Sequence, residues 1–342
     1  MNKEYQILHN AINELRNQTG KNIEFIQHKN KLDTSIIDAA VLIDRAKFIV
    51  EVKSEFRASN KGIILSKLNE LKDKTKLPVI IIANYIANEI QDDLKTKGIN
   101  YIDINGNAFI NEPGLFIYIS GRKIKKSNQK NQSIAFQEAG IKLIFSLLTE
   151  PHLTAYSYRA LAEISDISLG SISNIMNELE EQNFIIRTAK GRKLKNIKKL
   201  LNRWVIAYNE ILKPRILLNR MRFAKTEDYS NWDKIPLQDT EDINLWGAEP
   251  AAALKTGYLQ PEIFTIYTNS VWQSIASELK LIPDEEGKVE IRQIFWNEAY
   301  YIKREDKTAP TLLIYADLMG TGDDRNIETA NIILENELLH IR

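Results

Sequence analysis

The sequence predicts a multidomain protein of the α/β and α+β classes, with a mixed-sheet domain, a helical domain that carries a β-hairpin, and a C-terminal α/β domain. Its 342 residues are enough for two or three domains that each bury a core. Strand-length apolar runs dominate the first third, helical periodicity dominates the middle, and both alternate in the last third. We expect domains over residues 1–121, 135–223 and 244–342, with a basic linker over residues 122–134.

Charge is distributed unevenly along the chain. Residues 1–120 contain 16 basic and 15 acidic residues (+1), residues 121–225 contain 20 and 8 (+12), and residues 226–342 contain 10 and 22 (−12). The middle block suits a polyanion such as DNA, because each phosphate that a Lys or Arg neutralises releases counterions. The acidic block is predicted either to dock on a basic protein surface or to shield the middle domain.

Composition excludes several kinds of site. The chain has no cysteine, which excludes disulfides, thiolate metal sites and cysteine nucleophiles. No apolar run is long enough to span a bilayer, and the first residues lead into an amphipathic helix rather than a signal peptide. These features predict a cytoplasmic protein with no membrane partner, and they do not indicate its oligomeric state.

The first domain is predicted to form a mixed sheet covered by helices, in the order α-β-β-β-α-β-α-β. The strand 77–83 is apolar on both faces and is therefore expected at the centre of the sheet. The expected helices cover residues 4–19, 60–74 and 86–97, and the expected strands cover residues 23–27, 35–43, 47–53, 77–83, 99–103 and 115–119.

Three charged residues on the second and third strands could carry chemistry. Glu51 and Lys53 are two residues apart on one strand and face the same side, and Asp38 lies on the paired strand. Two carboxylates and a lysine are the minimum set for holding Mg²⁺ and activating a water against a phosphodiester. The alternative is an ion cluster at a sheet edge. The 103–107 segment is interpreted first as a turn that contains Asn-Gly. The alternative is a polar segment at the edge of this site.

The middle domain is predicted to contain helices over residues 141–148, 158–164 and 167–181, with Ser168 capping the third. One side of the third helix is apolar and is expected to face the core through Leu169, Ile172, Ile175, Met176 and Leu179. The opposite side carries Ser171, Ser173, Asn174 and Asn177. Short polar side chains near a helix start suit contact with base edges in a major groove.

A basic hairpin is expected directly after these helices. Its strands are predicted at residues 184–188 and 193–195, and eight Lys or Arg with no acid lie between residues 187 and 203. Arg187, Lys190, Arg192 and Lys193 are expected on phosphates or in a minor groove. Three helices followed by a hairpin resemble a winged helix-turn-helix. The alternative is a three-helix bundle or protein-docking module with a solvated basic face.

The remainder is predicted to be helical over residues 196–223, with a break near Pro214 and with Trp204 packed between domains. The last domain is expected to alternate helices (246–256, 271–279, 326–339) and strands (261–268, 289–295, 311–316). Asp317, Asp323 and Asp324 then fall where a strand runs into a helix. Acids there stabilise the helix dipole, and a metal site is the alternative interpretation.

Asp38 followed by Glu51-Val-Lys53, in the predicted element order, resembles the PD-(D/E)xK restriction-endonuclease-like fold. The resemblance implies that Asp38 and Glu51 are metal ligands for Mg²⁺ and that Lys53 orients the water or stabilises the transition state. Ile37 stands where the family pattern has proline before the first acid.

A wider resemblance covers nearly the whole chain. The domain order, together with the segments 101–108 (YIDINGNA), 246–252 (WGAEPAA) and 315–326 (YADLMGTGDDRN), is similar to AbiEi-type antitoxins and transcriptional regulators of type IV toxin–antitoxin systems. It implies a regulator that binds double-stranded operator DNA through its winged helix, needs no cofactor for that binding, and counteracts a nucleotidyltransferase-like toxin. A metal-dependent endonuclease guided to DNA by the winged helix is the alternative, so enzymatic activity stays open, and an interaction scaffold is the third possibility.

Overall fold

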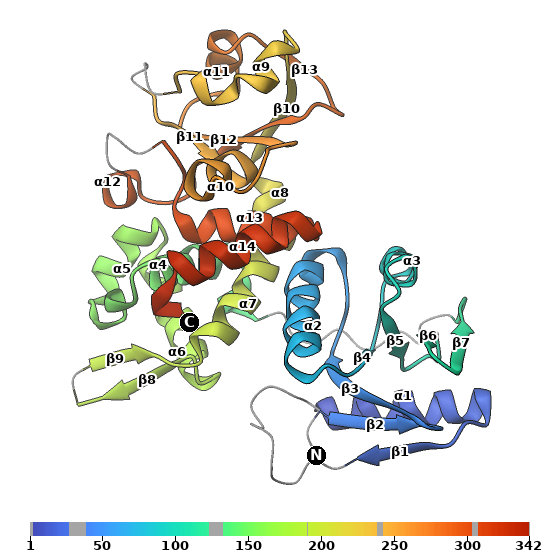
Figure 1. Ribbon diagram of the computed structural model, residues 1–342. Helices are drawn as coiled ribbons and strands as arrows, with labels where there is room; N and C mark the ends of the chain where they lie inside the picture. Colours follow the sequence, from blue (N-terminus) through green and yellow to red (C-terminus); the bar gives the residue numbers. More distant parts are fainter. Residues whose placement is uncertain are drawn as a thin grey trace. The chain divides into compact units, whose positions relative to one another are not determined.

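The computed structural model describes residues 3–26, 39–122, 133–189, 191–237, 242–302 and 307–341. Asp38 and Lys190, two of the predicted site residues, lie outside these ranges. The chain divides into two compact units, residues 1–129 and 130–342, and Figure 1 shows the elements of each. Within the described residues, no helix combines the length and the apolarity needed to cross a membrane.

The first unit is a seven-stranded sheet whose strands lie side by side in sequence order. β3 pairs in parallel with β4, and β4 with β5, whereas the other neighbours are antiparallel. The strands are β1 (Ile23–Ile26), β2 (Ala39–Ile43), β3 (Ala46–Lys53), β4 (Val79–Ala83), β5 (Asn100–Asp103), β6 (Ala108–Glu112) and β7 (Leu115–Ile119). The helices are α1 (Lys3–Thr19), α2 (Lys61–Thr75) and α3 (Asn88–Thr96), with the short 3₁₀ turn η1 (Ala58–Asn60) before α2. The mixed sheet is confirmed; β6 is a strand that the sequence analysis missed.

Residue alternation along β3 separates the two faces of this sheet. Val50 and its neighbours two residues away face α1, where Ile12 and Leu15 are fully buried. Ile49 faces the other side and packs with Leu71 of α2. Glu51 and Lys53 continue the Ile49 face, so both emerge on the α2 side at the carboxyl end of β3.

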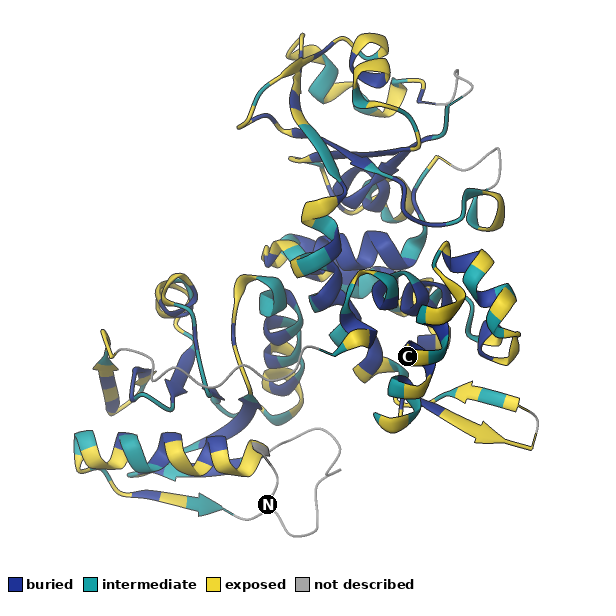
Figure 2. Ribbon diagram, turned by 180° about the vertical axis from the view of Figure 1, so that it is seen from behind, coloured by how far each residue is buried: buried dark blue, intermediate teal, exposed yellow. Residues whose placement is uncertain are grey.

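The first half of the second unit is helical and ends in an exposed hairpin (Figure 2). After η2 (Ile134–Phe136) its elements are α4 (Glu138–Thr149), η3 (Pro151–Ala155), α5 (Tyr158–Ser165), α6 (Leu169–Glu181), β8 (Ile185–Thr188) and β9 (Gly191–Leu194). This is the order of three helices and a hairpin that the sequence predicted. We call the stretch from α4 to β9, residues 138–194, the helix–hairpin segment.

The second half of this unit is a five-stranded sheet in the order β11-β12-β14-β10-β13, in which only β12 and β14 are parallel. The strands are β10 (Leu217–Phe223), β11 (Asn244–Gly247), β12 (Phe264–Thr268), β13 (Leu281–Pro283) and β14 (Val289–Gln293). The larger helices are α7 (Ile197–Ala207), α10 (Ala248–Thr256), α13 (Thr311–Thr321) and α14 (Asp324–Asn336). The shorter elements are the π-helical turn η4 (Tyr208–Leu212), α8 (Lys213–Arg215), α9 (Glu227–Ser230), η5 (Trp232–Lys234), α11 (Trp272–Glu278), α12 (Glu298–Tyr301) and η6 (Leu339–Ile341).

Three sequence predictions for this half were wrong. Residues 311–316 begin helix α13 rather than a strand, and α13 is buried along eight consecutive residues, 312–319. A helix that is apolar on all sides lacks the amphipathic period that would distinguish it from a buried strand. Residues 217–223 form strand β10 instead of continuing a helix, and residues 244–247 form strand β11 before α10 begins.

Aromatic packing joins the helix–hairpin segment to the C-terminal sheet. Phe145 of α4 has its ring centroid 6.1 Å from Trp204 of α7 and 5.3 Å from Phe295, which follows β14. Trp204 also donates a 2.9 Å hydrogen bond from Nε1 to the carbonyl of Ile141 in α4. Trp204 is fully buried, and its contacts named here are with α4.

Asp103 anchors the turn that follows β5. Its Oδ1 accepts from the amides of Asn105 (2.9 Å) and Asn107 (3.0 Å), and its Oδ2 accepts from Asn107 Nδ2 (2.7 Å). Burial raises the pKa of Asp103, and the bonds from Asn107 and Asn105 oppose that rise. The turn interpretation of residues 103–107 therefore accounts for this carboxylate.

Replacing Asp103 with alanine is expected to lower the free energy of unfolding by about 3 kcal/mol, because three donors are left without their acceptor in a buried place. Urea unfolding of the full chain, followed by circular dichroism, measures this. The exposed Asp73 of α2 is the matched control, and its alanine variant should change the unfolding free energy by less than about 0.5 kcal/mol. Equal losses in both variants would contradict the anchoring role.

Candidate nucleic-acid interface

Helices α5 and α6 are both capped by serine side chains. Ser157 accepts a 3.3 Å hydrogen bond from Ala160 N, and Ser168 accepts one of the same length from Ser171 N. Asp166 ends α5 in the left-handed conformation (φ 51°) and turns the chain toward α6. The predicted cap at Ser168 is confirmed, and the caps set where the outward face of α6 begins.

The outward face of α6 carries side chains without charge over its first two turns. Asn174 and Asn177 are exposed, and Ser171 and Ser173 are partly exposed. Ile172, Ile175, Met176 and Leu179 are buried as predicted, but Leu169 is 50% exposed, which corrects its assignment to the core. Leu169 is the first residue of α6, one turn before its first buried residue, Ile172. The first turn thus presents an apolar side chain beside the hydroxyls and amides.

The β8–β9 hairpin pairs two arginines directly across the strands. Arg187 lies opposite Arg192, and Ile186 lies opposite Lys193 on the other face. Like charges in a cross-strand pair repel each other, so each arginine needs another partner. Arg187 Nε lies 3.0 Å from Glu180 Oε2 of α6, and this bond raises the pKa of Arg187.

Arg192 fastens the hairpin to the turn η3. Its Nε donates to the carbonyl of Thr154 at 2.9 Å, and its Nη2 donates to the carbonyl of Tyr156 at 2.5 Å. Its guanidinium also lies 4.7 Å from the ring centroid of Tyr158. Thr154 Oγ1 returns a 3.1 Å bond to the carbonyl of Arg192. Much of the donor capacity of Arg192 is therefore used inside the fold.

The lysines after the hairpin tip are placed differently from the arginines. Arg203 stacks 3.9 Å above the ring centroid of Phe136, and its burial lowers its pKa. Lys193 and three further lysines all have exposed side chains: Lys195, Lys198 and Lys199. We call these four residues the lysine cluster. Among the predicted phosphate contacts, Lys193 is exposed and Arg187 and Arg192 are engaged, while Lys190 lies outside the described residues.

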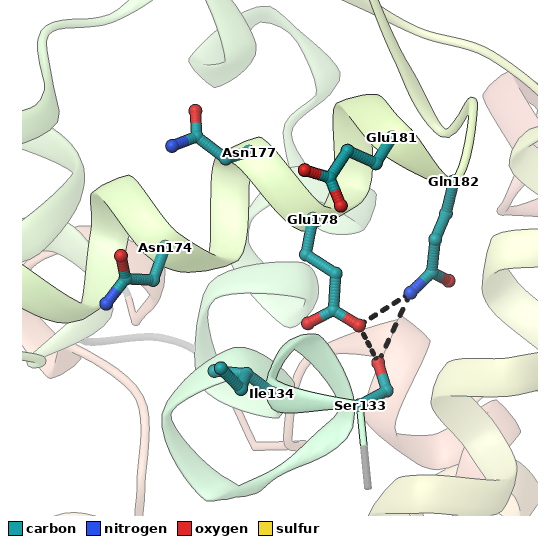
Figure 3. A pocket seen from close by; sticks show the side chains of 7 residues that line it. All are labelled: Ser133, Ile134, Asn174, Asn177, Glu178, Glu181 and Gln182. Atoms are coloured by element: carbon teal, nitrogen blue, oxygen red, sulfur yellow. Dashed lines mark hydrogen bonds between the residues drawn. The ribbon is translucent and has the colours of Figure 1, made fainter. Parts of the chain in front are cut away.

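An open groove of about 570 Å³ lies between α6 and the start of η2 (Figure 3). Glu178 reaches down from α6 and accepts hydrogen bonds from Ser133 Oγ, from Gln182 Nε2 (2.6 Å) and from the amide of Ala135 (2.8 Å). The groove is lined by Ser133, Ile134, Asn174, Asn177, Glu178, Glu181 and Gln182. The sequence analysis missed the structural role of Glu178, because nothing in a run of glutamates marks the one that binds a distant backbone.

The structure brings together two of the three residues predicted for metal chemistry. Glu51 is buried and forms an ion pair with Lys53, its neighbour on the same face of β3. Asp38 lies outside the described residues. Asp103 lies two strands away, in register with Lys53 across β4. Its carboxylate accepts hydrogen bonds from the turn that follows β5.

No group of three or more Asp, Glu or His side chains in the described ranges is arranged to hold a metal ion. Asp317 and Asp323, for which a metal site was the alternative interpretation, have separate roles. Asp323 caps α14 by accepting a 3.1 Å bond from Asn326 N, which agrees with the predicted helix-cap role. Asp317 lies inside α13, away from its start, so its predicted position at a helix start was wrong. It is buried and accepts from Tyr208 Oη (3.0 Å) and Tyr267 Oη (2.8 Å).

Comparison with known proteins identifies one family. Residues 193–339 match the model of a family described as transcriptional regulator, AbiEi antitoxin, type IV TA system. The match begins in β9 and extends into η6, a little under half of the chain. No curated protein and no solved structure matches the chain. The C-terminal part of the chain is thus similar to transcriptional regulators and antitoxins of type IV toxin–antitoxin systems.

Proposed function

We propose that this protein is a DNA-binding transcriptional regulator with an antitoxin role. In this proposal the helix–hairpin segment is a winged helix that binds operator DNA, and a nucleotidyltransferase-like toxin is the protein partner. The family match at residues 193–339 supports the regulatory class. The observation that carries DNA binding is the uncharged face of the first two turns of α6 together with the four exposed residues of the lysine cluster, which follow it in the chain.

The two kinds of side chain have different tasks. Exposed lysines attract phosphates through charge and position the protein on a duplex, but they carry little sequence information. Asn174 and Asn177 can form paired hydrogen bonds with an adenine edge, and Leu169 can contact a thymine methyl group. Three acids follow these asparagines in α6: Glu180 pairs with Arg187, Glu178 is held by Ser133 and the amide of Ala135, and Glu181 is exposed at the C-terminal end of the helix.

Changing the four residues of the lysine cluster to alanine is expected to weaken binding to the DNA upstream of the protein's own gene, and to weaken it on unrelated DNA as well. The slope of log Kd against log salt should fall by about 0.9 for each phosphate that is no longer neutralised. A gel-shift or fluorescence titration at several salt concentrations measures both. Lys72 and Lys74, exposed on α2, provide the control variant. A slope unchanged by the cluster variant, or no shift of wild-type protein at low salt, would reject the proposal.

Changing Asn174 and Asn177 to alanine tests sequence recognition separately. We expect each change to cost about 1–3 kcal/mol on the operator, which lowers the preference for operator over unrelated DNA. The salt slope should stay the same because no charge is removed. Asn231, exposed and outside the helix–hairpin segment, is the matched control position. An equal loss on operator and unrelated DNA would contradict base recognition by α6.

A metal-dependent nuclease is the second candidate, favoured by the ion pair of Glu51 and Lys53 on one face of β3. This candidate predicts cleavage of duplex DNA with Mg²⁺ or Mn²⁺, and a loss of at least about 100-fold in Lys53→Ala and Asp38→Ala. A plasmid-nicking assay with purified variants measures it. Cleavage that survives both substitutions would indicate a contaminating nuclease and would remove this candidate.

A further inference from the structure

A charged pocket lies in the C-terminal sheet, apart from the helix–hairpin segment. It encloses about 290 Å³ between α8, α10, α13 and the strands β10, β12 and β14. Three cations and three carboxylates line it: Lys213, Arg220, Arg292, Glu249, Glu290 and Asp317. The numbers of positive and negative groups are equal, so net charge does not indicate which ligand the pocket prefers. The preference depends on which of these groups can still form hydrogen bonds.

The carboxylates of this pocket are already engaged. Asp317 accepts from two tyrosines and pairs with Lys213 at 2.9 Å. Glu290 pairs with Arg220 at 2.7 Å and also with Arg292. Glu249 accepts bonds from the amides of residues 262 (2.6 Å) and 263 (3.2 Å) and from Asn326 Nδ2 (2.8 Å). These contacts leave the acids little need for a cationic ligand.

The groups of this pocket that can still form hydrogen bonds are donors. Arg292 is 4% exposed, and its Nε has no hydrogen-bond partner among the described residues, although the rest of its guanidinium binds Glu290 and the carbonyl of Lys213 (2.8 Å). A buried donor left unsatisfied costs about 1–3 kcal/mol, and Arg292 is one of the residues that line the pocket. Arg220 is half exposed at the mouth and can direct further N–H groups inward.

The start of α10 adds donors of a second kind. Ala248 and Glu249, the first residues of this nine-residue helix, line the pocket, and no side chain caps the helix at Gly247. The first N–H groups of a helix have no partner within it and carry a partial positive charge. Helix N–H groups together with Arg and Lys side chains form a common type of phosphate site.

We propose that this pocket binds a small molecule that carries a phosphate group. The phosphate accepts from Arg292 Nε, from Lys213 and Arg220, and from the first amides of α10. A phosphate alone is smaller than 290 Å³, so an organic body fits beside it against Ile263, an apolar lining residue. The site lies in residues 213–321 and does not depend on whether the helix–hairpin segment binds DNA.

Titration calorimetry of the full chain with inorganic phosphate, at constant ionic strength, tests this site, with acetate as the carboxylate probe. We expect phosphate binding in the millimolar range or tighter, and acetate binding at least about tenfold weaker. Arg220→Ala should weaken phosphate binding about tenfold, and Arg292→Lys should weaken it at least as much while keeping a positive charge.

Two controls make the result specific. Arg222 lies on the same strand as Arg220 with nearly equal side-chain exposure, 46% against 48%, but does not line the pocket, so Arg222→Ala should bind phosphate normally. The lysine-cluster variant should also bind it normally, which separates this site from the proposed DNA interface. Circular dichroism identifies any variant that fails to fold. If Arg292→Lys unfolds, the Arg220→Ala variant still tests the site, because Arg220 is half exposed. Absence of phosphate binding, preference for acetate, or equal loss in Arg222→Ala would overturn the proposal.

Discussion

The aromatic cluster around Phe145 is the packing on which the second unit depends. Phe145 contacts Trp204 of α7 and Phe295 beyond β14, and Trp204 stacks on Tyr208 at 5.5 Å. Phe145, Trp204 and Phe295 belong to elements that are far apart in the sequence, and all four rings are buried. Because large aromatic side chains bury much area and pair in specific geometries, they hold the helix–hairpin segment against the C-terminal sheet. The region that matches the AbiEi family and the proposed DNA interface are therefore parts of one packed unit.

Arginines and lysines do different work in the basic middle of the chain. Arg192 and Arg203 are used to hold the hairpin and α7 in place, through carbonyl oxygens and aromatic rings. A planar guanidinium suits such contacts, because it donates in several fixed directions and stacks on rings. The lysine cluster, whose ammonium groups are strongly hydrated, stays at the surface. The net positive charge of this block thus overstates how many basic groups are available to a phosphate backbone.

Several buried polar residues of the C-terminal half form connected networks. Asp317 joins Tyr208 and Tyr267, whose own hydroxyls lie 2.7 Å apart, and burial together with the nearby carboxylate raises the pKa of both phenols. Glu290 joins two arginines in the same pocket. Buried charges are tolerated when partners satisfy them, and this network leaves a donor, Arg292 Nε, as the group with unused capacity. The acidic composition of this third of the chain consequently gives no guide to the charge of the ligand that its pocket prefers.

Local sequence patterns by themselves determined that the first domain is a mixed sheet with helices. They also determined the three helices and hairpin of the middle segment and the cap at Ser168. Each of these depends on short-range periodicity, capping or turn chemistry, which a few neighbouring residues specify. Tertiary structure alone decided that residues 311–316 are helical, because burial on every side removes the amphipathic signal. It also decided which basic residues face solvent, that Leu169 is exposed, and that Glu249, Glu290 and Arg292 share a pocket. Those outcomes depend on contacts between residues many tens of positions apart, and no local pattern in the sequence encodes such contacts.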